Sequence, residues 1–258
     1  MRHLLSVICL LLVCSGGQLS AQCRQALALG LDVSGSVDVE EYRLQLDGVA
    51  AALADPEVQA AFFAMEDLPV RLMVYEWSGL WDQTIIVPWT NITGAEQLAI
   101  VAQRLQQDRK RLAKDGSTAI AAAMRFGAAE LMAQSECWQK TLDISGDGPA
   151  NFGEHPKSVT SEEIGFITIN ALVVLPLGRA NTTKNLTNVK TLETYFRSFV
   201  LRGQGAFIEP ASDYTDFARA MRQKLIKELQ LPNLSDLGNM HMEQKAIKPR
   251  QYLPGLHQ

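Results

Sequence analysis

The chain has 258 residues, of which 47% are hydrophobic, and its formal net charge at pH 7 is −4. This length and composition favour one domain with a sizeable core, together with terminal extensions. A slightly acidic chain without a basic cluster is not typical of a protein that binds nucleic acid.

The first 21 residues have the pattern of a secretory signal peptide. A short polar start, Arg2-His3, precedes an apolar core at 4–13 and a cleavage site after Ala21. Cys14 raises the alternative of a lipoprotein signal, but a valine precedes it where a small residue is expected. We therefore expect an exported chain, periplasmic or extracellular, and no other segment is long and apolar enough to cross a membrane.

Two of the four cysteines lie in this signal, which leaves Cys23 and Cys137. An even number of cysteines in an exported protein suggests a disulfide. Cys23 lies nine residues before Asp32, and Cys137 lies ten before Asp147. If both strands run parallel, both cysteines lie at one end of the sheet, opposite the acids, and can pair. Two unpaired buried thiols are the alternative.

Residues 27–38 (LALGLDVSGSVD) join an apolar run to a polar turn. The run is typical of a buried strand in a parallel sheet. Asp32, Ser34 and Ser36 follow on alternate positions, and oxygen ligands on a tight turn suit a hard cation such as Mg²⁺. The same residue types also cap helices and form turns, so this stretch alone leaves both interpretations open.

Strands and helices alternate along the rest of the chain. Apolar residues at helical spacing predict a helix over 39–62, and the runs at 70–77 and 83–87 predict two strands that pair as a hairpin. Further helices are predicted at 95–107, 119–134, 161–166, 189–202 and 214–229, and further strands at 140–144, 168–175 and 206–209. This order predicts a doubly wound, mostly parallel α/β sheet with helices on both faces.

The composition shifts beyond Pro232 and the periodicity is lost. We therefore expect three parts: a signal peptide at 1–21, one domain at 22–231, and a loose tail at 232–258.

Three loops at strand ends or before helices carry oxygen ligands and a glycine. They are DVSGS at 32–36, DGST at 115–118 and SGDG at 145–148. In an open α/β sheet, ligands bind outside the carboxyl ends of the strands. Three such loops at one edge favour a cation site, although Ser117 or Thr118 can also cap the helix that follows.

DVSGS, GST and SGDG, in this order and spacing, resemble the metal-ion-dependent adhesion site (MIDAS) of the von Willebrand factor type A (vWA) domain. The resemblance covers about residues 24–230 and is strongest to secreted bacterial proteins of this fold with undescribed function. It implies a six-stranded sheet of order 3-2-1-4-5-6 in which strand 3 is antiparallel, which agrees with the hairpin. It also places Cys23 beside Cys137.

The resemblance further implies roles for individual residues. Ser34 and Ser36 match hydroxyls that bind the metal directly, Thr118 matches the hydroxyl of the second loop, and Asp32 and Asp147 match acids that often act through water. The cation would be Mg²⁺, Mn²⁺ or Ca²⁺. With two acids among neutral hydroxyls it keeps an open position, which an Asp or Glu of a protein partner can fill.

The family's chemistry is binding, so the resemblance implies a module without enzymatic activity. A Mg²⁺-dependent hydrolase or phosphatase using Asp32 and Asp147 is one alternative. Against it, Ser34 stands where a dehalogenase-type enzyme needs a second acid, and the G-x-S-x-G elbow is absent. A metal-free scaffold is another alternative. Asp38 suggests a second metal site of the integrin kind, but an acid leading into a helix is the preferred interpretation.

Overall fold

A strand that is buried along its whole length forms the centre of the sheet. The computed structural model describes residues 23–107, 115–175 and 183–230. In it, β1 (Cys23–Asp32) pairs in parallel with both β2 (Val70–Trp77) and β4 (Cys137–Gly146). Because both faces of β1 are covered, its sequence is continuously apolar between Ala26 and Leu31.

The strands described lie in the order β3-β2-β1-β4-β5-β6. β3 (Gln83–Ile92) runs antiparallel to β2, whereas β5 (Thr168–Val174) and β6 (Ile208–Ala211) continue the parallel ladder beyond β4. The predicted sheet order, with its single antiparallel strand, is therefore confirmed.

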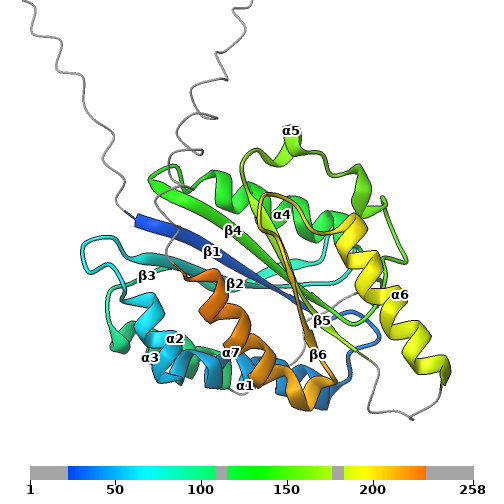
Figure 1. Cartoon of the computed structure of the whole chain (residues 1–258), viewed down its shortest axis with the longest axis horizontal. Helices are drawn as coiled ribbons and strands as arrows, with labels where there is room; N and C mark the ends of the chain where they lie inside the picture. Colours follow the sequence, from blue (N-terminus) through cyan, green and yellow to red (C-terminus); the bar gives the residue numbers. More distant parts are fainter. Residues whose placement is uncertain (1–22, 108–114, 176–182, 231–258) are drawn as a thin grey trace, which may run out of the picture.

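Helices cover both faces of this sheet, as predicted (Figure 1). One layer holds α1 (Val39–Ala54), α2 (Pro56–Phe62), α3 (Ala95–Gln106) and α7 (Phe217–Glu228). The other holds α4 (Ile120–Met132), α5 (Ser161–Ile164) and α6 (Thr183–Phe199). Successive residues of β1 point to opposite faces, so Leu27 and Leu29 enter the α1 core while Ala26 and Ala28 enter the α4 core.

The single helix predicted over 39–62 is two helices. Asp55 ends α1, and its carboxylate accepts hydrogen bonds from the backbone N–H groups of Glu57 and Val58 at the start of α2. Pro56 occupies the first turn of α2, where a missing N–H costs nothing, but it cannot continue α1.

Several predicted boundaries also shift. β4 begins at Cys137 rather than at 140, because its first residues pair with β1 although their side chains are partly polar. β3 runs on to Ile92 through Pro88, which an edge strand tolerates. Helix α6 begins at Thr183 rather than at 189, and β6 lies at 208–211 rather than at 206–209.

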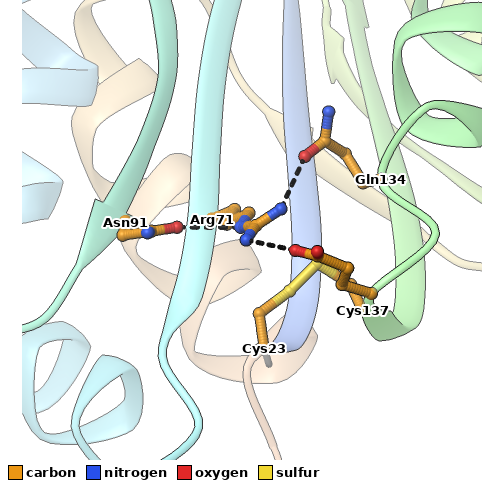
Figure 2. The surroundings of a disulfide bond; sticks show 6 residues. Cys23, Arg71, Asn91, Gln134 and Cys137 are labelled. Carbon is orange, nitrogen blue, oxygen red and sulfur yellow. Dashed lines mark hydrogen bonds and ion pairs between the residues drawn. A yellow bond between two sulfur atoms is a disulfide. The ribbon is translucent and has the colours of Figure 1, made fainter. Parts of the chain in front are cut away.

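A disulfide joins Cys23 to Cys137 at the amino-terminal ends of β1 and β4 (Figure 2). The two residues are register partners with their Cα atoms 4.6 Å apart. Both lie at the same end of the sheet, as their similar distances along the sequence from Asp32 and Asp147 predict. Arg71 lies beside the bond and donates to Asn91, Gln134 and Glu136. The amino-terminal ends of β2, β1 and β4, which are neighbours in the sheet, are thus held together.

The predicted signal peptide and the predicted tail lie outside the described residues. Within the described ranges, no helix has both the length and the apolar character that a membrane span requires.

Candidate metal site

The carboxyl ends of β1 and β4 bring the first and third polar loops to one edge of the sheet. The two strands stay in parallel register up to the pair Gly30 and Ile144. Asp32 therefore ends one strand beside Gly146 at the end of the other. A Cβ added to Gly146 would lie 3.5 Å from Asp32 Oδ2, so the Asp32 carboxylate borders the space beside Gly146.

Four of the five predicted ligands are connected through their side chains. Asp32 Oδ1 accepts a hydrogen bond of 2.8 Å from the backbone N–H of Ser34, which closes the turn after β1. Ser34 Oγ lies 3.2 Å from Ser36 Oγ, and Ser36 Oγ donates to Asp147 Oδ1 at 2.7 Å. Asp32 and Ser34 are fully buried, whereas Ser36 is exposed and Asp147 is partly exposed, so the cluster opens to solvent on one side.

The second loop is held against the first through two glycines. The backbone N–H of Gly35 donates to the carbonyl oxygen of Gly116 at 2.8 Å. A Cβ on Gly35 would lie 2.8 Å from that oxygen, so a larger residue would push the loops apart. Thr118, two residues further on, is buried, and its backbone N–H donates to Asn151 Oδ1. The fifth predicted ligand therefore lies in a loop that packs against the other four.

The expectation that Ser117 or Thr118 caps the following helix is wrong. Helix α4 begins at Ile120 with Ala119 at its N-cap, and no side chain caps it. The N-cap position, residue 119, follows Thr118 by one residue and Ser117 by two, so neither hydroxyl occupies it. The backbone N–H of Ser117 instead donates to Asp115 Oδ1.

A buried network of polar side chains from β4 and α1 holds the backbone of Asp32 in place. Ser145 Oγ accepts from the backbone N–H of Asp32 and lies 3.2 Å from both Gly30 O and Gln45 Oε1. The amide of Gln45 in turn donates to Asp32 O at 2.8 Å. Gln45 is not among the site residues predicted from the sequence, although a polar residue beside Leu46 on the apolar face of a helix is a signal that could have identified it.

Tyr214 is a further residue of the site that the sequence did not reveal. It begins the short 3₁₀ helix η3 (Tyr214–Asp216) after β6 and is buried. Burial and then the negative charges of Asp147, Asp32 and Glu41 raise the pKa of its phenol. The Tyr214 hydroxyl therefore lies in the negative field of the cluster.

Asp38 behaves as a helix cap. Its carboxylate accepts from the backbone N–H of Glu41 at 2.8 Å, and its own N–H donates to Glu41 Oε2 at 3.0 Å. These reciprocal bonds are a capping box, the arrangement expected of an acid that leads into a helix.

The donor set fits a hard cation. All the predicted ligand atoms are oxygens, the donor type that Mg²⁺, Mn²⁺ and Ca²⁺ prefer. Among the described residues no group of three or more His, Cys, Asp and Glu is arranged to hold a metal, so a site here depends on the serine and threonine hydroxyls. Two neighbouring ligands of an octahedral Mg²⁺, each about 2.1 Å from the ion, lie about 3.0 Å apart. The Ser34–Ser36 hydroxyl separation of 3.2 Å is close to that spacing.

A family described as "Protein of unknown function (DUF1194)" matches residues 22–233. The chain belongs to this family. A search of curated proteins found no match.

Several solved structures share the fold of this member of the family. Proximal thread matrix protein 1 (PTMP1) from the mussel byssus has 15% identity and a TM-score of 0.51, over 81% of this chain and 49% of that one. A PTMP1 structure with a zinc-occupied MIDAS motif has 14% identity and a TM-score of 0.53, over 81% and 48%. The open conformation of the pilus adhesin SpaC from Lactobacillus rhamnosus GG has 14% identity and a TM-score of 0.54, over 80% and 30%.

The chain thus spans about half the length of PTMP1 and less than a third of SpaC. At these identities the likeness shows the fold, which is vWA-like, as the three loops of the sequence predicted.

Proposed function

We propose that the protein is an exported binding module that holds a divalent cation and captures a protein partner through it. The ligands are Asp32, Ser34, Ser36, Thr118 and Asp147, and the cation is Mg²⁺, Mn²⁺ or Ca²⁺. The observation that carries this proposal is the bond from the Ser36 hydroxyl to the Asp147 carboxylate, which joins the first loop to the third.

Electrostatics supports a cation at this position. Asp32 and Asp147 are linked through Ser34 and Ser36, and both carboxylates, together with Glu41, contribute negative charge at Tyr214. Like charges at short range repel, and a cation among them removes that cost. PTMP1, which shares the fold, has been crystallised with zinc in its MIDAS motif. When bound, such an ion supplies a Lewis-acidic position that an Asp or Glu carboxylate of a partner can occupy.

The residues of the chain then have separate tasks. The Ser145–Gln45 network holds the Asp32 backbone, and Asp32 holds the turn that presents the two serine hydroxyls. Asp147 accepts from Ser36 on the solvent side, where a partner can approach. The Cys23–Cys137 disulfide supports folding outside the cytoplasm, because such bonds persist in oxidising compartments.

Titration calorimetry with Mn²⁺ on the mature chain tests the cation site. We expect one bound ion in the wild type and at least a tenfold loss of affinity in Ser36→Ala and Asp147→Asn, whose side chains are not buried in the core. Asp115→Asn is the matched control, because Asp115 is an exposed acid of the second loop outside the ligand set. Equal Mn²⁺ affinity in all four proteins would refute the assignment.

A pull-down from the extracellular or periplasmic fraction tests partner capture. Wild type with Mg²⁺ is compared with wild type in EDTA and with Asp32→Ala. We expect partners that are retained only in the first sample, and equal retention in all three would show that the cluster is not the binding surface. Metal-dependent turnover in a phosphatase and esterase screen, lost in Asp147→Ala, would instead establish the hydrolase alternative.

A further inference from the structure

Two further loops lie directly beside the metal cluster. The turn of the β2–β3 hairpin is joined to the second loop, because the backbone N–H of Ala119 donates to Ser78 O at 2.8 Å. The loop after Asp147 is joined to it as well, because the backbone N–H of Asn151 donates to Thr118 O at 3.0 Å. Both loops therefore border the same edge of the sheet as the predicted ligands.

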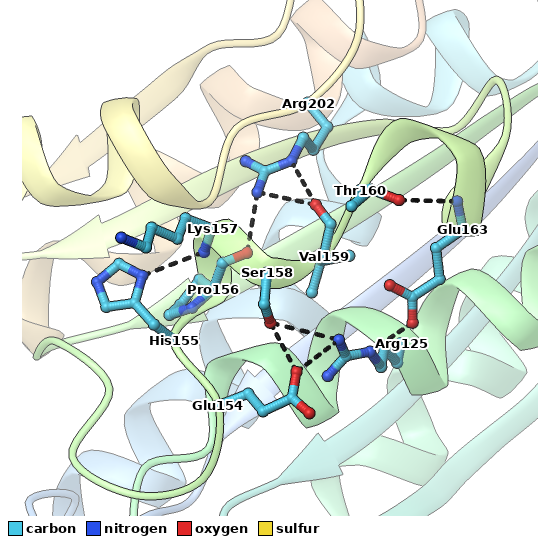
Figure 3. Close-up of polar contacts among 10 residues, drawn as sticks. All are labelled: Arg125, Glu154, His155, Pro156, Lys157, Ser158, Val159, Thr160, Glu163 and Arg202. Atoms are coloured by element: carbon cyan, nitrogen blue, oxygen red, sulfur yellow. Dashed lines mark hydrogen bonds and ion pairs between the residues drawn. The ribbon is translucent and has the colours of Figure 1, made fainter.

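These two loops also contact each other. A Cβ added to Gly153 would lie 2.5 Å from Leu80 Cδ2 in the hairpin turn, so the loops pack without a gap. The segment that follows is anchored to α4, where Arg125 donates to Glu154 Oε2 and to Ser158 Oγ (Figure 3). Arg202 holds the same segment through the backbone oxygen of Val159. The loop after Asp147 is thus fixed on both sides.

Large apolar side chains stand in solvent on these loops. Trp81, next to Leu80, is 95% exposed, and Phe152, next to Gly153, is 52% exposed. Val39, three residues after Ser36 and outside these two loops, is 76% exposed in the first turn of α1. A tryptophan that is almost wholly in water forgoes the large apolar burial that this residue usually provides. Exposed aromatic side chains grouped beside polar ones are typical of an interaction surface.

We propose that the partner segment recognised here is an extended polypeptide in which an Asp or Glu is accompanied by an aromatic or aliphatic residue. The inference rests on the proposed function. The acid reaches the cation held by the three loops, and the apolar side chain packs on Trp81 and Phe152, which we define as the apolar rim.

Charge and surface chemistry both favour this occupant. A cation at the cluster is complementary to a carboxylate, and the apolar rim is complementary to an uncharged side chain next to it. Within the apolar rim, Phe152 has no polar side-chain atom and Trp81 has a single N–H donor, so the rim offers contact area rather than the several hydrogen bonds that an acidic oligosaccharide would need. Tryptophan is also among the residue types enriched in side chains that dominate binding energy.

Fluorescence anisotropy with labelled synthetic peptides tests the inference. The set places one Glu in a Gly-Ser background, adds a Phe or Leu at each position on either side, and includes the same peptides without the Glu. In Mg²⁺ we expect the best apolar position to tighten binding about tenfold over Glu alone. EDTA should abolish binding of both.

Two tryptophan variants provide matched readouts. Trp81→Ala should remove the apolar gain and leave the affinity for the Glu-only peptide unchanged. Trp138→Ala should retain both, since Trp138 is 44% exposed but follows Cys137 at the opposite end of the sheet. Both side chains are exposed, so neither variant is expected to unfold the protein.

The outcomes separate the two proposals. If Glu-only and Glu-plus-apolar peptides bind equally at every position, the inference is overturned while the cation-dependent function stands. If binding needs neither Glu nor Mg²⁺, the proposed function itself fails. If a uronic acid oligosaccharide binds more tightly than any peptide and loses that affinity in Trp81→Ala, the partner is a carbohydrate and the polypeptide assignment is overturned.

Discussion

A buried lysine on α7 pairs with two buried carboxylates, one from β4 and one from α7 itself. Lys224 Nζ lies 3.1 Å from Asp143 Oδ1 and also pairs with Glu228 on its own helix. Asn170 donates to Glu228 Oε1 at 2.7 Å. Two carboxylates that share one ammonium leave an excess negative charge in the core when both are ionised. Burial, reinforced by Glu228 and opposed by Lys224, therefore raises the pKa of Asp143 to about 7.

This raised pKa predicts that stability falls as the pH rises. An unfolded Asp loses its proton near pH 3.9, whereas folded Asp143 keeps it to about pH 7. Between these values the folded state binds the extra proton, so the free energy of unfolding decreases across about pH 4 to 7 and this contribution is constant above it. Asp143→Asn cannot titrate and should flatten that decrease, measured by urea unfolding at pH 5 and pH 8.

Asp47→Asn is the matched control for this pH dependence, because Asp47 is an acid on the surface of α1 that forms an exposed pair with Arg43. It should keep the wild-type difference between the two pH values. An Asp143→Asn protein that loses as much stability as the wild type between pH 5 and pH 8 would contradict the assignment to Asp143.

At the scale of one element, the capping box of α1 separates two interpretations of Asp38. Asp38→Ala leaves the backbone N–H of Glu41 without its side-chain acceptor and should lower the free energy of unfolding by about 1 kcal/mol. Asp38→Ser should recover most of that loss, because serine also caps helices. Urea unfolding measures both.

The metal stoichiometry provides a second test of Asp38. A helix cap does not hold a second ion, so the number of bound Mn²⁺ ions should be the same in wild type and Asp38→Ala. A lower number in Asp38→Ala would instead support a second metal site.

The two edge strands show how the sheet avoids pairing with other chains. β3 carries Pro88 and β6 carries Pro210, and proline has no N–H to offer to a neighbouring strand. The sequence-based prediction ends the third strand at residue 87, just before Pro88, and therefore makes the strand too short. The strand continues because only one of its sides must pair.

The sequence predicts those elements and site residues whose pattern is local. The apolar run of β1 and the loop at 32–36 indicate both a central strand and a polar cluster at its end. Contacts from distant segments leave no such pattern. Tyr214 reaches the acids because β6 and η3 end at the same edge, and Gln45 reaches Asp32 because α1 packs beneath the turn. Only the assembled sheet brings these side chains together.

Across the whole molecule, β1 separates two sites at opposite ends. Its first residue carries the disulfide and its last residue carries the buried acid of the metal cluster. Between them, β1 is paired with a strand on each side. A change in cross-linking at one end is therefore not expected to alter the geometry at the other while the sheet stays folded.

Removal of the disulfide should thus lower stability without lowering metal affinity. The bond joins residues 114 positions apart, and in the chain-entropy model a loop of that length contributes about 4–5 kcal/mol to the free energy of unfolding. The double variant Cys23→Ser/Cys137→Ser should lose about 2–5 kcal/mol in urea unfolding, and the wild type in reducing agent should lose a similar amount. Calorimetry with Mn²⁺ at low temperature, where the variant is folded by circular dichroism, should give the wild-type affinity. A folded variant that has lost Mn²⁺ binding would mean that the two ends of β1 are coupled.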